Sequence, residues 1–142
     1  MKRITLVPLI LLVALSRLPA EEGSHVQVKI TQKYLVALCL NEERVKESQR
    51  SWNLPTKEQS MAFTMKNQPR SGNNNREVDS GVAVIHFTLV DGHHYEIETR
   101  GPSESYSTRV WRKNEWKPVV RDRTTGLIVS SDPEWIDKDC RK

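Results

Sequence analysis

The sequence predicts an α+β domain in which one helix, or a broken pair of helices, packs on an antiparallel sheet of about four to six strands. Two segments carry this prediction. Between Val26 and Arg50 the apolar residues recur at close to helical spacing. Residues 81–100 form two runs that alternate between apolar and polar residues, which is typical of a hairpin with one buried face.

The helical segment is open to two interpretations. The apolar positions from Ile30 to Val45 fit a helix, whereas Val26 and Val28 alternate with polar residues as a short strand would. In the helical interpretation Asn41 interrupts the helix and serves as the N-cap of a second one.

The predicted hairpin at residues 81–100 contains a three-residue loop, Val90 to Gly92. This loop length places Ile85 opposite Ile97 and makes one face of the pair apolar throughout. Gly92 then occupies the left-handed position that such a loop requires. The apolar face is expected to pack on the helix and the polar face to meet solvent.

A second hairpin is predicted from the runs 106–112 and 116–121, which a short turn joins. Two registers are open. A three-residue loop turns Trp116 inward and Trp111 outward, whereas a two-residue loop pairs the two tryptophans. Pro118 has no N–H to donate, so it should face a sheet edge or a bulge.

Three stretches resemble the nuclear transport factor 2-like superfamily, which includes ketosteroid isomerases and small exported bacterial domains. They are KYLVALCLNEERVKE, GVAVIHFTLVDGHHYEIET and RVWRKNEWKPVV, and together they cover roughly residues 30–121. The resemblance implies a sheet that curves into a cone, as in nuclear transport factor 2-like or cystatin-like domains. Asn41 stands where the family usually has an acid, and the isomerase base and oxyanion donors align with no residue here. The resemblance therefore assigns no catalytic residue and no cofactor.

The first twenty residues are predicted to be a signal peptide. Lys2 and Arg3 precede the apolar run Ile4–Leu15, and Ala20 supplies a small residue before a cleavage site. An uncleaved anchor is the alternative, although the run is short for a membrane span. We expect a secreted or periplasmic protein with no membrane contact after cleavage.

Cleavage leaves one globular domain, residues 21–142, with a mobile loop at about residues 67–80, where turn formers and charges gather. It also removes Lys2, Arg3 and Arg17, so the 22 basic residues fall to 19 against 18 acidic ones and the net charge falls from +4 to +1. Binding of nucleic acid is therefore not favoured, because the excess positive charge lies mostly in the leader.

Two cysteines, Cys39 and Cys140, remain in the mature chain. An even number of cysteines in an exported protein favours a disulfide, and two free thiols are the alternative. The C-terminal tail that carries Cys140 is expected to be held by Trp135 and by this bond.

A metal site is not expected. His93 and His94 are adjacent, and adjacent strand residues point to opposite faces. His86, His94 and Glu96 share the predicted outward face but lack a characteristic ligand spacing.

Basic and aromatic residues gather near the second hairpin. The candidates for a ligand-binding or interface surface are Tyr95, Arg109, Trp111, Arg112 and Lys117. An outward tryptophan among arginines is typical of a dimer face or of a site for an anionic ligand, and we rank a dimer face first.

Two classes of function fit the sequence. The first is an exported, non-catalytic binding or interaction module of unknown ligand, which could dimerise through its sheet. The alternative is a small enzyme or small-molecule carrier with an apolar pocket between helix and sheet. The predicted inward face is apolar with Tyr95 as its one polar tip, which favours the binding module, because an enzyme needs positioned titratable groups in a cleft.

Overall fold

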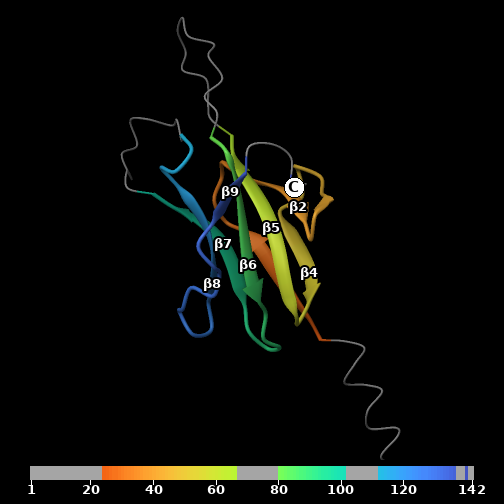
Figure 1. Ribbon diagram of the computed structural model, residues 1–142. Coiled ribbons are helices and arrows are strands. Elements are labelled where there is room, and N and C mark those ends of the chain that lie inside the picture. The colour runs from red at the N-terminus through yellow and green to blue at the C-terminus, as the bar shows by residue number, and fades with distance from the viewer. Residues whose placement is uncertain (1–23, 67–79, 102–111, 137–139, 141–142) are drawn as a thin grey trace, which may run out of the picture.

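The computed structural model describes residues 24–66, 80–101, 112–136 and 140, and these ranges contain strands but no helix. The strands form two sheets around one core (Figure 1). The predicted α+β class is therefore wrong, and the described part of the chain is an all-β sandwich.

The two sheets differ in strand number and pairing. The four-stranded sheet has the order β4 (Ser51–Pro55), β1 (His25–Ile30), β7 (Tyr95–Arg100) and β8 (Lys117–Asp122). The five-stranded sheet has the order β3 (Glu43–Arg44), β2 (Leu35–Leu40), β5 (Glu58–Met65), β6 (Val82–Thr88) and β9 (Glu134–Ile136). All neighbours are antiparallel except β1 and β7, which run parallel.

The core takes alternate residues from both sheets. In the four-stranded sheet β1 and β4 expose every second residue and bury the others. The buried set that meets between the sheets includes Val28, Trp52, Phe63, Ile85 and Ile97. Period-two burial is what a sheet with one solvated face requires, so the strand interpretation of Val26 and Val28 is the correct one.

The helix prediction failed because of an irregularity in β2. Its pairing with β5 shifts by one residue between Ala37 and Cys39. This bulge places Leu35, Ala37 and Leu40 toward the core, so the inward spacing changes from two residues to three and imitates a helix.

Asn41 is not a helix cap. It forms a two-residue turn with Glu42 between Leu40 and Glu43, which pair directly. Both turn residues have positive φ, 49° for Asn41 and 68° for Glu42, as a type I′ hairpin turn requires. The Asn41 side chain donates to Oε1 of the buried Gln59 over 2.7 Å, which ties the turn to β5.

The predicted hairpin at residues 81–100 is also wrong, because β6 and β7 belong to different sheets. Ile85 and Ile97 are both buried, since each faces the common core from its own sheet. The chain turns where the N–H of His93 donates to the carbonyl of Val90 over 3.3 Å, and Gly92 has the expected positive φ of 81°. An alternating pattern is the same for two paired strands and for two strands facing each other across a core.

The inward orientation of Trp116 is confirmed, because this residue immediately before β8 is only 2% exposed. The expectation for Pro118 also holds. The N–H groups of Val120 and Asp122 point away from β7 and donate to the segment 127–130. By strand alternation Pro118 lies at that same edge, where its missing N–H breaks no ladder bond.

Residues 127–131 carry the chain from one sheet to the other. The Ser130 hydroxyl accepts the N–H of Val120 on β8 over 2.9 Å. The Ser131 hydroxyl accepts the N–H of His86 on β6 over 3.0 Å. This crossing segment closes one edge of the sandwich, and β9 follows it along β6 as a strand that the sequence did not predict.

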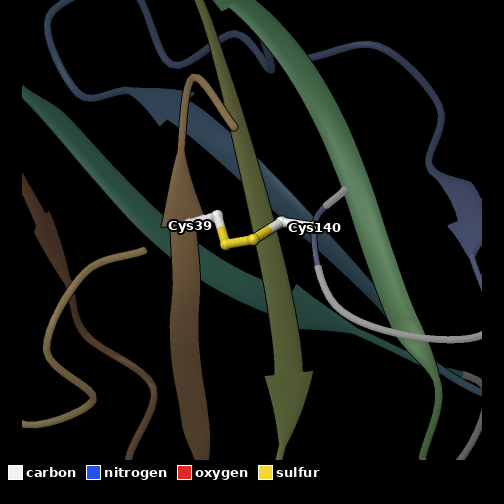
Figure 2. The surroundings of a disulfide bond; sticks show 2 residues. All are labelled: Cys39 and Cys140. Atoms are coloured by element: carbon white, nitrogen blue, oxygen red, sulfur yellow. A yellow bond between two sulfur atoms is a disulfide. The ribbon is translucent and has the colours of Figure 1, made fainter. Parts of the chain in front are cut away.

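The Cys39–Cys140 disulfide is confirmed, with a Cα–Cα separation of 5.9 Å. Figure 2 shows the bond lying over β5, and both cysteines pack with Ala62 of that strand. The bond therefore fixes the C-terminal segment to the outer face of the five-stranded sheet. Its sequence separation of 101 residues corresponds to a stabilisation of about 4 to 5 kcal/mol in the chain-entropy account.

Several predicted segments lie outside the described residues. They are the signal peptide at 1–20, the loop at 67–80 apart from Ser80, and the run 106–112 apart from Arg112. In the ranges that the structure does cover, no helix is long and apolar enough to cross a membrane.

Replacing Glu42 by glycine should raise the stability of the protein. The substitution creates Asn-Gly, the preferred pair for a type I′ turn, and removes a side chain from a left-handed position that costs about 1 kcal/mol. We expect the free energy of unfolding in urea to rise by about 1 kcal/mol. Glu43→Gly on β3 is the control and should lower it by about 0.5 to 1 kcal/mol. A loss of stability in Glu42→Gly would contradict the assigned turn.

Candidate functional site

A groove of about 380 Å³ lies where the edges of the two sheets part, between the start of β8 and β9. We call Trp116 and Trp135 its aromatic floor, and Arg100 and Lys117 its basic rim. Pro133 and Glu115 also line it. The volume falls in the range of small-ligand sites.

The aromatic floor is held by the core beneath it. The Trp116 indole N–H donates to the carbonyl of Ser80 over 2.9 Å. Ser80 is buried, and its hydroxyl donates to the carbonyl of Met65 over 2.8 Å. Trp135 meets Trp116 edge to face, with ring centroids 5.1 Å apart and planes at 86°, a favoured aromatic geometry.

Gly81 allows the Trp135 ring to lie against the backbone. Its φ is +75°, and a Cβ at this position would lie 3.0 Å from a ring carbon of Trp135. The same Cβ would lie 2.9 Å from Cγ of Lys113. Only glycine fits both the backbone conformation and the close approach, so the floor is pre-formed rather than assembled by a ligand.

A second hollow, of about 70 Å³, lies beside the disulfide on the outer face of the five-stranded sheet. His86 and Glu134 are among its lining residues. Its volume accommodates a few water molecules but no larger ligand. The groove above the aromatic floor is therefore the candidate functional site.

The structure separates the residues that the sequence grouped as a ligand-binding or interface surface. Lys117 lines the groove, and Arg112 is exposed in the turn that precedes it. Tyr95 lies in the core and is 2% exposed. Arg109 and Trp111 lie outside the described residues.

The three candidate metal ligands are not brought together either. His86 lies on an outward position of β6, and Glu96 lies on an outward position of β7 in the other sheet. His94 lies in the turn before β7. Among the described residues no three His, Cys, Asp or Glu side chains lie close enough to hold a metal ion.

The sequence did not predict the pairing of His93 with Asp122. Nδ1 of His93 donates to the Asp122 carboxylate over 2.6 Å. The same carboxylate accepts the N–H groups of Thr124 at 2.9 Å and Thr125 at 3.3 Å. Asp122 therefore joins the turn after β6 to the turn after β8.

Two pKa shifts mark this end of the sandwich. Burial acts to raise the pKa of Asp122, but the bonds from His93 and from the two threonine N–H groups outweigh it and hold the pKa below its ordinary value. Burial raises the pKa of Tyr95, whose hydroxyl accepts the N–H of Val90 over 2.7 Å. Tyr95 begins β7 and Arg100 ends it, so the pair lies about 17 Å from the basic rim at the strand rise.

Sequence reasoning missed most of the groove. Arg100 was not among the predicted binding residues, and Trp135 was predicted only as an anchor of the tail. A tryptophan in the polar tail SSDPEWIDKDCRK was the available signal. Nothing in the sequence showed that this tail would lie beside Trp116, because the contact joins two different sheets.

Comparisons with protein-family models, curated proteins and solved structures give no match to this chain. They do not test the resemblance to the nuclear transport factor 2-like superfamily, although the helix-on-sheet fold that it implied is not the fold of the described residues.

Asp122→Asn should destabilise the protein in a pH-dependent way. The folded-state pKa of Asp122 is lowered, so its carboxylate stabilises the fold above the unfolded pKa of 3.8 and loses this contribution as the pH falls through the lower folded value. At about pH 7 the variant should lose about 1 to 3 kcal/mol in urea unfolding, because it gives up a charged hydrogen-bond acceptor. The difference from the native protein should shrink below about pH 4.

Asp91→Asn is the matched control. Asp91 is exposed in the neighbouring turn, and its substitution should change stability by less than about 0.5 kcal/mol. An equal loss for Asp122→Asn at neutral and acidic pH would show that the carboxylate charge has no part in holding the two turns.

Proposed function

We propose that this chain is an exported, non-catalytic binding module and that the groove between β8 and β9 receives its ligand. The observation that carries the proposal is the aromatic floor. Trp135 remains partly exposed while Trp116, Gly81 and Ser80 fix its position. A rigid aromatic surface at the bottom of a groove loses little conformational entropy on binding.

The position of the titratable groups favours binding over catalysis. In the part of the chain that the structure describes, the two side chains with shifted pKa values are Tyr95 and Asp122, and they lie at the end of β7 away from the groove. Both are engaged in hydrogen bonds that hold turns: Tyr95 accepts the N–H of Val90 in the turn before β7, and Asp122 joins that turn to the one after β8. The alternative of an apolar pocket between a helix and the sheet loses its basis, because the described residues form sheets alone.

Dimerisation through a sheet edge is a second way in which the module could bind. The described edges offer little free backbone for it. β3 has two residues, and β9 has three. On β4 the Ser51 carbonyl accepts the Gln49 side chain, and Pro55 lacks an N–H. Short and interrupted edges resist pairing with another chain, so the proposal rests on the groove.

Export is part of the proposal and is supported by the disulfide. Disulfides form and persist in oxidising compartments and are rare where thiols are kept reduced. Cys39 is 1% exposed and Cys140 is 8% exposed, which keeps the bond away from reductants. The signal-peptide pattern of residues 1–20 points to the same route.

Ligand binding should perturb the groove. In nitrogen-15 NMR spectra, titration with defined sets of peptides, oligosaccharides and small aromatic compounds should shift the Trp135 indole resonance and the Arg100 amide for at least one set. The amides of His93 and Asp122 are the internal control, since they lie at the far end of β7. Shifts confined to that far end, or none with any set, would contradict a binding site in the groove.

The exported protein should lack its leader and its free thiols. Mass spectrometry of protein recovered from the medium or periplasm should give a chain that starts near Glu21. Thiol titration under denaturing conditions should find none before reduction and two after it, from Cys39 and Cys140. A full-length chain with two free thiols would contradict export.

A further inference from the structure

Most charged side chains on the outer face of the four-stranded sheet form ion pairs with side chains of opposite charge. Glu98 on β7 pairs with Arg121 on β8 over 2.8 Å. Glu96 lies 3.9 Å from Lys29 on β1 and 3.6 Å from Arg123. The carboxylates of β7 therefore have cationic partners within this sheet.

At the end of the sheet beside the groove, two positive charges face each other without a matched carboxylate from the described strands between them. Arg100 lies directly opposite Lys117 in the pairing of β7 with β8. Like charges at directly opposed positions destabilise a sheet. Both side chains are exposed, and among the described residues none forms an ion pair with Arg100. Lys117 approaches Asp132 to 3.6 Å, but Asp132 is 95% exposed, so water screens that contact.

Glu115 places one negative charge in the lining of the groove and offsets only part of the charge of the basic rim. Its carboxylate accepts the backbone N–H of Arg112 over 3.1 Å, which turns it back into its own loop. The side chain of Arg112 adds a further exposed cation next to the groove. Counted over the described residues, the groove thus combines an apolar floor with a local excess of positive charge, although the mature chain is predicted to be nearly neutral.

This combination discriminates between kinds of anion. A sulfated polysaccharide would meet the basic rim mainly through its charge, and it carries no apolar side chain to insert above Trp135 and Pro133. A small anion would leave the floor uncovered. An extended peptide can place an apolar side chain on the floor and carboxylates on either side of it, and arginine binds carboxylates in a two-bond geometry.

We propose that the groove binds an extended acidic segment of a partner protein, with an apolar side chain on Trp135 and carboxylates paired to Arg100 and Lys117. The inference rests on the proposed function and adds the chemical class of the ligand.

Selection of phage-displayed random peptides on the oxidised protein tests the proposal. The selected peptides should carry several Asp or Glu residues around an apolar or proline residue. Their affinity for the double variant Arg100→Glu/Lys117→Glu should fall by roughly tenfold or more, since two attractive contacts become repulsive. A new selection on that variant should return peptides rich in Lys and Arg.

The matched control reverses two other lysines. Lys46 and Lys57 are exposed and lie outside the groove. Lys46→Glu/Lys57→Glu changes the net charge by the same amount, and peptide affinity should stay within about twofold because exposed charges beyond a Debye length are screened. Equal urea unfolding curves for both double variants would show that the loss of binding is not a loss of folding.

Three results would overturn the acidic-peptide proposal alone. The first is a set of selected peptides with no acidic excess, and the second is equal binding by the two double variants. The third is failure to select any peptide while heparin oligosaccharides bind and shift the Trp135 resonance. In that third case the groove would still be a binding site, so the proposed function would stand. If selected peptides bind without shifting groove resonances and no other ligand set shifts them, both proposals fail.

Discussion

The crossing of the chain from the sheet of β8 to the sheet of β6 decides where β9 and Cys140 can lie. The hydroxyls of Ser130 and Ser131 accept backbone N–H groups from strands of different sheets, so they replace ladder bonds that neither sheet supplies at that edge. Once the chain has crossed, it can only continue along the free edge of β6, and this places Trp135 against Gly81 and Trp116. The groove and the disulfide both depend on this placement.

The alternation of apolar and polar residues was a good predictor of which side chains face the core. It was a poor predictor of which strands pair with each other. Ile85, Ile97 and Trp116 are buried as expected. The predicted pairing of β6 with β7 was wrong, because a hairpin and a connection between two sheets show the same alternation in the sequence. The helix was predicted because a bulge changed the spacing in β2 and because Asn41 is favoured both at helix caps and in left-handed turns.

The candidate site was only partly predictable for a related reason. Lys117 and Trp116 lie in a stretch whose composition drew attention, and both line the groove. Trp135 and Pro133 reach it only through β9, a three-residue strand with no signal of its own. The hydrogen bond between Asp122 and His93 is also a long-range contact, since the two residues lie 29 positions apart in the sequence. Sites built between the edges of two sheets are set by the order of the strands, and local patterns do not encode that order.

The disulfide divides the strands into two topological groups. β3 to β9 lie within the covalent ring that Cys39 and Cys140 close, whereas β1 lies outside it. Yet β1 occupies an inner position of the four-stranded sheet, between β4 and β7. In the oxidised chain β1 can therefore leave or enter the sheet without passing through the ring that Cys39 and Cys140 close. The disulfide thus does not restrain the detachment of β1 from the sheet. The strands inside the covalent ring are consequently packed around β1, which is held in the sheet by noncovalent contacts alone.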